Sequence, residues 1–262
     1  MGKPLDEHFW RSMLEGTDPS LTRFQRMFRR LPNAPRCKLC NAPFRRPGSL
    51  LIRPFGYRRW PANPSLCSIC ARGLEQVRGG AEIEATFLFA DIRGSTAIAE
   101  HMRPEALHAL LERFYVAAAQ AIDAAGGLVD KYLGDGVVAM FVPVFTQGNA
   151  PAMAGIAAGQ GLLRSTGHGA GSSPWLPVGV GVHAGPAFVG VMGTEGGALD
   201  FTGVGDTVNT AARLGSVAGA GELLVSVVAA EQAGLATAGL EHRRLQLKGR
   251  DEPVDVVVLG AE

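Results

Sequence analysis

The chain has 262 residues, of which 47% are hydrophobic and 19% are charged, and its formal net charge is +1. This is enough material for one hydrophobic core of ordinary size and a smaller accessory module. No apolar run approaches the length that crosses a bilayer, and residues 1–7 (MGKPLDE) lack the apolar segment of an export signal. The sequence therefore predicts a cytoplasmic protein without membrane insertion.

The near-zero net charge hides an asymmetry along the chain. Residues 1–60 contain 13 Lys/Arg against 4 Asp/Glu, whereas the remainder contains 12 against 20. The basic part could pair with the acidic part or meet an anionic partner. With Gly79 and Gly80 as a boundary, we expect an N-terminal helical segment (1–35), a cysteine-containing module (36–78) and a larger domain (82–262).

The N-terminal segment shows helical periodicity. Apolar residues between Phe9 and Phe28 recur at helical spacing and predict a short helix, which Pro32 and Pro35 would end. Residues 37–70 that follow are rich in proline, arginine and aromatic residues and show little periodicity. Such a stretch needs an external staple to hold its shape.

Four cysteines supply a candidate for that staple: Cys37, Cys40, Cys67 and Cys70 form two Cys-x-x-Cys pairs. In a chain without an export signal, this spacing favours a tetrahedral metal site over disulfides. Structural zinc is the favoured ion, with rubredoxin-type iron or an iron–sulfur cluster as alternatives. The surrounding arginines allow nucleic-acid binding, but no reading helix is recognisable, and we favour regulation or dimer support.

The larger domain alternates strand and helix patterns in an α/β or α+β order. Strands are expected at 85–91, 128–133, 137–142, 178–183, 187–191, 222–226 and 254–259, and helices at 107–125, 150–163 and 207–218. The Gly-Asp-Gly triplet at 134–136 predicts a β-hairpin between the second and third strands.

Two carboxylates stand where the predicted backbone turns sharply. Asp91 ends a buried strand, and Asp135 occupies the tip of the hairpin. Paired carboxylates suit Mg²⁺ or Mn²⁺ bound together with substrate phosphates. Gly94, Ser95 and Thr96 follow at the start of a helix, where backbone N–H groups could hold a triphosphate. Taken singly, the two aspartates would more ordinarily be a helix cap and a turn.

Four ordered motifs change that balance: residues 89–96 (FADIRGST), 131–136 (KYLGDG), 181–185 (GVHAG) and 205–214 (GDTVNTAARL). Together they resemble the catalytic domain of class III adenylate/guanylate cyclases, and residues 247–254 (LKGRDEPV) are similar to that family's closing strand pair. The resemblance covers about residues 82–260 and implies an α+β fold of the ferredoxin-like βαββαβ type.

The resemblance also implies roles for individual residues. Asp91 and Asp135, with the main-chain carbonyl of Ile92, would bind two Mg²⁺ or Mn²⁺ ions. Lys131 and Thr202 match the positions that read the purine, and threonine there resembles class IIIb, whose members are commonly bicarbonate-stimulated adenylate cyclases. This pair favours adenine, and therefore ATP over GTP.

Asn209 and Arg213, four residues apart on one helix face, would orient the ribose and stabilise charge on the α-phosphate. Lys248 is a candidate contact to a terminal phosphate, whereas we expect His101, His183 and Asp206 to be structural.

The activity implied is conversion of ATP to 3′,5′-cyclic AMP and pyrophosphate, for signal transduction, at the interface of a homodimer. A catalytically silent nucleotide-sensing module, a guanylate cyclase and a zinc-dependent nucleic-acid binder remain as alternatives.

Overall fold

The computed structural model describes residues 7–61, 63–76, 78–169, 173–193, 199–250 and 252–261. The first six residues, on which the expectation of no export signal depends, lie outside these ranges. Within them, no helix has the length and apolar character required to cross a membrane.

The chain forms two compact units. The sheet unit comprises Glu84–Val142, Asn149–Ala187 and Val204–Glu262. The cysteine unit comprises Met1–Ile83, Pro143–Gly148 and Phe188–Gly203. Three of the boundaries between the units fall inside strands, namely β1, β4 and β5. The predicted division into three segments remains a prediction.

The main sheet has the strand order β2-β3-β1-β4-β6-β8-β7. Its strands are β1 (Gly79–Ile92), β2 (Leu128–Leu133), β3 (Gly136–Phe141), β4 (Val178–Gly193), β6 (Leu223–Ser226), β7 (Glu241–Leu245) and β8 (Val254–Leu259). β3 pairs antiparallel with both β1 and β2, and β4 pairs parallel with β6. The predicted α+β, ferredoxin-like class is confirmed, since a strand, a helical segment, a hairpin, a second helix and β4 follow in that order.

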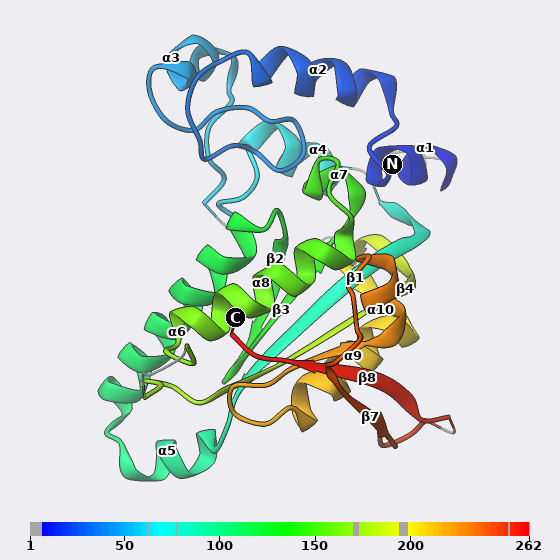
Figure 1. The fold of residues 1–262 in the computed structure, drawn as a ribbon. Coiled ribbons are helices and arrows are strands. Elements are labelled where there is room, and N and C mark those ends of the chain that lie inside the picture. Colours follow the sequence, from blue (N-terminus) through cyan, green and yellow to red (C-terminus); the bar gives the residue numbers. More distant parts are fainter. Residues whose placement is uncertain are drawn as a thin grey trace. The chain divides into compact units, whose positions relative to one another are not determined.

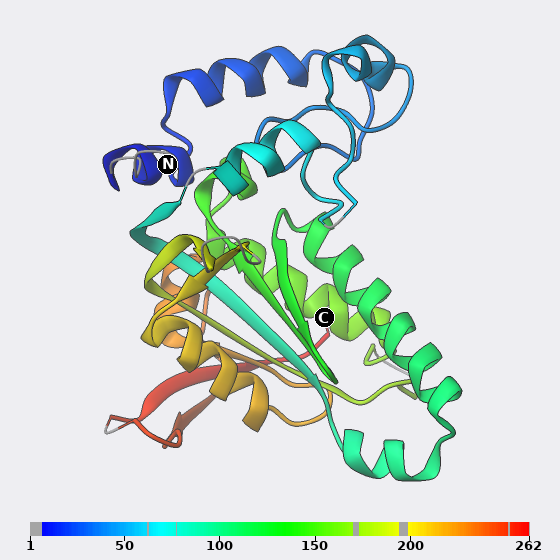
Figure 2. The same cartoon turned by 180° about the vertical axis from the view of Figure 1, so that it is seen from behind.

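Helices cover both faces of this sheet (Figures 1 and 2). On one face α6 (Pro104–Ala124), α8 (Pro151–Ser165) and α10 (Val227–Gln232) build the larger core. On the other, α9 (Asp206–Val217) packs through Leu214. Successive side chains of β6 point to opposite faces of the sheet, so Leu223 and Val225 belong to the first core and Leu224 to the second.

Helix α6 shows why the apolar spacing predicted a helix here. Pro104 occupies its first turn, and Phe114, Ala118 and Ile122 form its buried stripe. Gly126 follows with a φ of +88°, a conformation that favours glycine. A separate short helix, α5 (Ser95–His101), precedes it.

The cysteine unit contains α1 (Glu7–Leu14), α2 (Pro19–Arg29), α3 (Gly48–Ile52), the 3₁₀ helix η1 (Arg53–Phe55), α4 (Ser68–Gln76), α7 (Pro143–Thr146) and β5 (Leu199–Val204). The prediction of one N-terminal helix is wrong. Gly16 adopts a φ of +72°, and the Asp18 carboxylate accepts a 2.7 Å hydrogen bond from the backbone N–H of Leu21, which starts a second helix.

Other predicted boundaries also differ. The strands expected at 178–183 and 187–191 form the single strand β4, while β5, α7, α10 and the short helices between residues 48 and 76 were not expected. Gly79 and Gly80 lie in β1 instead of a linker. A Cβ at Gly80 would lie 2.4 Å from the carbonyl oxygen of Val189, so close backbone packing explains that glycine.

Candidate active site and cysteine centre

The hairpin places Asp91 and Asp135 side by side. Asp91 pairs in register with Gly136, and the backbone N–H of Ile92 donates to the carbonyl oxygen of Asp135 over 3.1 Å. The pKa of Asp91 is raised, chiefly by burial. The negative charge of Asp135 and a hydrogen bond between the two side chains add to this rise. Two carboxylates that share one space in this way form a donor set suited to hard divalent cations. The structure thus supports the pairing that the sequence predicted.

Arg93 meets the same carboxylate and was not predicted. Its guanidinium forms an ion pair with Asp91, which opposes the rise in the pKa of that group. It also donates to the carbonyl oxygens of Ser216 at 2.6 Å and Ala218 at 3.3 Å. Arg93 therefore connects the end of β1 to the end of α9.

A pocket of about 380 Å³ opens beside Asp135. Its lining is mainly apolar, with side chains of α5 and α6, and includes Ser95 and Thr96; their predicted contact with a triphosphate stays a prediction. Gly94 precedes α5 with a φ of +70°, and no side chain caps that helix start. Beside the pocket, the Tyr115 hydroxyl donates to the carbonyl oxygen of Gly134, which braces the hairpin tip; nothing in the sequence marked this tyrosine.

Helix α9 carries Asn209 and Arg213 one turn apart. Asn209 is exposed and Arg213 partly buried. The loop after β7 lies against this helix: a Cβ at Gly249 would be 3.3 Å from the Arg213 guanidinium, and Arg250 binds the Asp206 carboxylate and the Thr210 hydroxyl. Asp206 is thus a structural anchor, as expected, and Arg250 is its unpredicted partner.

Lys248 lies in this loop and is exposed. Its predicted phosphate contact is not tested by the structure. His183 is partly buried on β4, and its Nδ1 lies 2.8 Å from the hydroxyl of Ser226. Burial lowers the pKa of His183 to about 4, so this imidazole is neutral at pH 7 and its structural assignment is supported. His101 ends α5 and is exposed.

The two predicted purine-reading residues belong to different units. Lys131 lies on β2 in the sheet unit, is 43% exposed, and has its ammonium 3.6 Å from the Asp130 carboxylate. Thr202 lies on β5 in the cysteine unit and is 7% exposed. The recognition of the purine by Lys131 and Thr202 together therefore stays a prediction.

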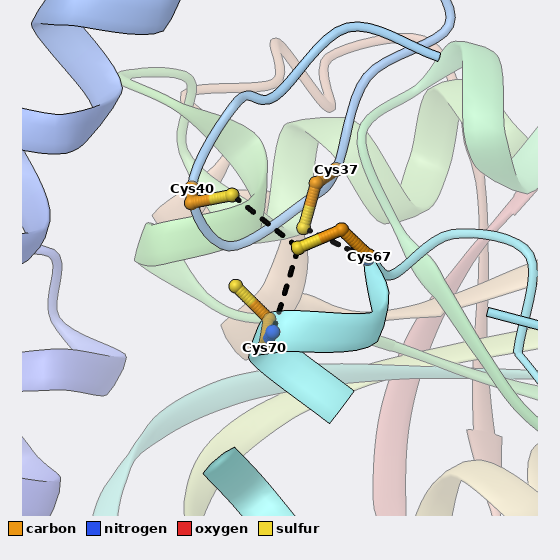
Figure 3. A group of neighbouring side chains, drawn as sticks. All are labelled: Cys37, Cys40, Cys67 and Cys70. Carbon is orange, nitrogen blue, oxygen red and sulfur yellow. Dashed lines mark hydrogen bonds between the residues drawn. The ribbon is translucent and has the colours of Figure 1, made fainter. Parts of the chain in front are cut away.

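The four cysteine sulfurs converge in the cysteine unit (Figure 3). All lie within 4.8 Å of one another, and the Sγ atoms of Cys40 and Cys67 are 3.7 Å apart. Tetrahedral zinc with bonds of about 2.3 Å would separate its sulfurs by about 3.8 Å. The spacing therefore fits one tetrahedral ion.

Backbone N–H groups also point at two of these sulfurs. The backbone N–H groups of Cys67 and Cys70 donate to Cys37 Sγ at 3.3 Å and to Cys67 Sγ at 3.4 Å. Hydrogen bonds within the cluster lower the pKa of Cys67 and raise the pKa of Cys40 and Cys70. Metal ligation requires the deprotonated form, and the convergence of the four sulfurs allows one ion to stabilise it.

Two of the arginines around the cysteines, Arg36 and Arg59, contact other groups of the same unit. Arg36 donates to backbone carbonyls of Phe28, Leu31 and Asn41, and the Arg59 guanidinium lies 5.2 Å from the centre of the Phe44 ring. These hydrogen bonds and this ring contact connect the loops around the cysteines to neighbouring segments of the unit. The preference for regulation over nucleic-acid binding stays a prediction.

Comparison with known proteins agrees with this geometry. The family model described as the adenylate and guanylate cyclase catalytic domain matches residues 81–259. An adenylate cyclase of Anabaena cylindrica is 34% identical over 167 residues, which cover 60% of this chain and 32% of the relative. A terminal-differentiation specific adenylate cyclase of Dictyostelium discoideum is 30% identical over 150 residues, or 55% and 7% of the two chains. This chain thus spans a third or less of these curated relatives.

Solved structures lead to the same family. The guanylyl cyclase Cya2 has a TM-score of 0.61 and 29% identity, over 69% of this chain and 93% of that one. The adenylyl cyclase CyaB from P. aeruginosa has a TM-score of 0.59 and 28% identity, over 70% and 97%. The resemblance seen in the sequence is confirmed: this chain belongs to the family of adenylate and guanylate cyclase catalytic domains, preceded here by a four-cysteine module.

Proposed function

We propose that the protein is an adenylate cyclase that converts ATP to 3′,5′-cyclic AMP and pyrophosphate. The observation that carries the proposal is the adjacency of Asp91 and Asp135 beside a pocket that also contains Ser95 and Thr96. A helix-capping aspartate and a turn aspartate would not need to lie next to each other, whereas Asp91 and Asp135 are both partly buried and their side chains interact. The raised pKa of Asp91 indicates that this arrangement has a cost, as is common at functional sites.

Asp91, Asp135 and the carbonyl of Ile92 would hold two Mg²⁺ or Mn²⁺ ions. When bound, such ions increase the acidity of the 3′-hydroxyl and neutralise the triphosphate. The N–H groups after Gly94 and the hydroxyls of Ser95 and Thr96 bind phosphate oxygens, and Lys248 contacts a terminal phosphate. Asn209 orients the ribose, while the planar guanidinium of Arg213 binds the oxygens of the α-phosphate as their charge grows.

The active form is a head-to-tail homodimer in this proposal. Asp91 and Asp135 of one subunit face Lys131, Thr202, Asn209 and Arg213 of the other, so each dimer has two equivalent sites. The support is the family resemblance together with the exposure of Lys131 and Asn209, which leaves both available to a partner.

Lys131 and Thr202 select adenine, with Lys131 donating to a ring nitrogen and the Thr202 hydroxyl accepting from the exocyclic amino group. We expect kcat/KM for ATP to exceed that for GTP at least about tenfold, because a site built for one hydrogen-bond pattern rejects the other. Lys131→Glu should reverse or abolish this preference.

The matched control is Arg244→Glu, the same charge reversal at an exposed position on β7. It should leave the ratio unchanged. A wild-type ratio that favours GTP would instead indicate a guanylate cyclase, the activity named for Cya2.

We also propose that the four cysteines hold one structural zinc ion. The sulfur spacing and the backbone N–H donors support a closed Cys₄ site. Elemental analysis of the purified protein should find about one zinc per chain. A coloured preparation that contains iron would contradict this assignment.

A further inference from the structure

A path of contacts inside the cysteine unit leads from the cysteine cluster to the strand that carries Thr202. Its first step is Asn41, which directly follows the ligand Cys40. Asn41 is fully buried and adopts a φ of +65°. Its backbone N–H donates to the carbonyl oxygen of Cys37 over 2.9 Å, so the loop that presents the sulfurs fixes the backbone position of Asn41.

The second step joins this loop to the segment after β3. The Asn41 side-chain oxygen accepts a hydrogen bond from the Gln147 carboxamide, whose own oxygen accepts from Arg29 at 3.3 Å. Gln147 ends the turn of α7, because its backbone N–H donates to the carbonyl oxygen of Pro143 over 3.2 Å. The position of the Gln147 side chain, 106 residues further along the chain, therefore depends on the cysteine loop.

The third step reaches β5. Phe145 of α7 is 2% exposed, and its ring packs edge-on against Phe201, with 6.1 Å between ring centres. α1 packs against α7 as well (Figure 1), and Trp10 of α1 is 1% exposed. Phe201 directly precedes Thr202, and neighbouring side chains on a strand point to opposite faces. The packing of Phe201 thus sets the backbone position from which Thr202 projects.

We infer that metal binding at Cys37, Cys40, Cys67 and Cys70 controls purine recognition, with Asn41, Gln147 and Phe145 as the positioning residues that connect the cluster to Thr202. The inference rests on the proposed function, because it assigns Thr202 to the purine. The coupling runs through one contiguous set of packed and hydrogen-bonded groups. Asp91 and Asp135 lie in the other unit and are not on this path. Metal loss should therefore affect KM and nucleotide preference more than kcat.

The test uses the full-length chain with zinc loaded, removed by a chelator, and loaded again, each sample then being assayed with restored Mg²⁺ or Mn²⁺. Hydrogen exchange of residues 199–204 should accelerate on zinc removal and recover on reloading. Exchange in residues 136–141 of β3, in the sheet unit, should stay the same. In parallel, KM for ATP should rise about fivefold and the ATP/GTP preference should fall, as for a typical coupling between sites.

Asn41→Gly separates the connection from the metal site itself. Glycine accepts the positive φ and removes the whole side chain, including the carboxamide that binds Gln147. This variant should keep its zinc, yet show the faster exchange at 199–204, the higher KM and the weaker ATP/GTP preference. The matched control is Asn63→Gly in the same module, where the lost contact is a 3.1 Å bond from the Ser65 N–H and lies off the path.

Two results would overturn the inference: equal exchange at 199–204 with and without zinc, or an Asn41→Gly variant that behaves like Asn63→Gly. The proposed function fails separately, because a chain that makes no cyclic nucleotide in any metal state would still report the coupling through hydrogen exchange.

Discussion

Replacing Asp135 or Asp91 by asparagine should lower kcat for cyclic nucleotide formation by about 10³-fold or more, since each change removes a charged metal ligand from the site. Asparagine keeps the shape and one oxygen, so the loss reports on charge and coordination. The measurement is the steady-state rate of cyclic AMP formation with Mn²⁺ at saturating ATP.

The thermal stability of the Asp91→Asn variant should not fall with its activity. Burial raises the pKa of Asp91 in the folded protein. At pH 7 the carboxylate is ionised in the unfolded chain, so folding has to place a charge in an environment that disfavours it, and this lowers the free energy of unfolding. Asp91→Asn should therefore leave Tm equal or higher. Asp255→Asn, an exposed carboxylate on β8, is the matched control and should change neither activity nor Tm. If the Asp91 and Asp135 variants lose their fold together with their activity, the two residues are a cap and a turn after all.

Mixing an inactive Asp91→Ala chain with an inactive Arg213→Ala chain should restore activity. In a head-to-tail dimer the two lesions fall into the same site of the heterodimer, which leaves the second site intact. With random exchange, half of the dimers are mixed and each has one good site, so about a quarter of wild-type activity should return.

Asp91→Ala mixed with Asp135→Ala is the control for this experiment. These lesions lie on the same half of the site, so every dimer lacks an intact metal pair and no activity should return. Recovery in the control, or none in the first mixture despite dimer formation, would exclude the shared-site arrangement.

The core of the catalytic domain could be predicted from local signals. A buried strand ending on Asp91 and the Gly-Asp-Gly turn at Asp135 are short-range patterns, and antiparallel pairing of β1 with β3 brings them together. The stripe of α6 was equally clear because it repeats over five turns. In the catalytic domain, the long periodic stretch of α6 forms the expected helix.

Other features depend on contacts between distant parts of the chain. Arg93, Tyr115 and Arg250 look like ordinary polar residues, and their roles come from carbonyls and carboxylates up to 125 residues away. The helices between residues 48 and 76 are too short to show periodicity, and their loops are held by the cysteine cluster. Strand β5 has only six residues, one of them Gly203, and Thr202 was found only through family resemblance.

The central claim is tested most directly by incubating the purified chain with ATP and Mn²⁺ and identifying both products by mass spectrometry or phosphorus NMR. The account predicts 3′,5′-cyclic AMP and pyrophosphate in equal amounts, with neither product from Asp135→Asn. ADP and phosphate, or unchanged ATP under Mg²⁺ as well as Mn²⁺, from a folded protein would contradict it.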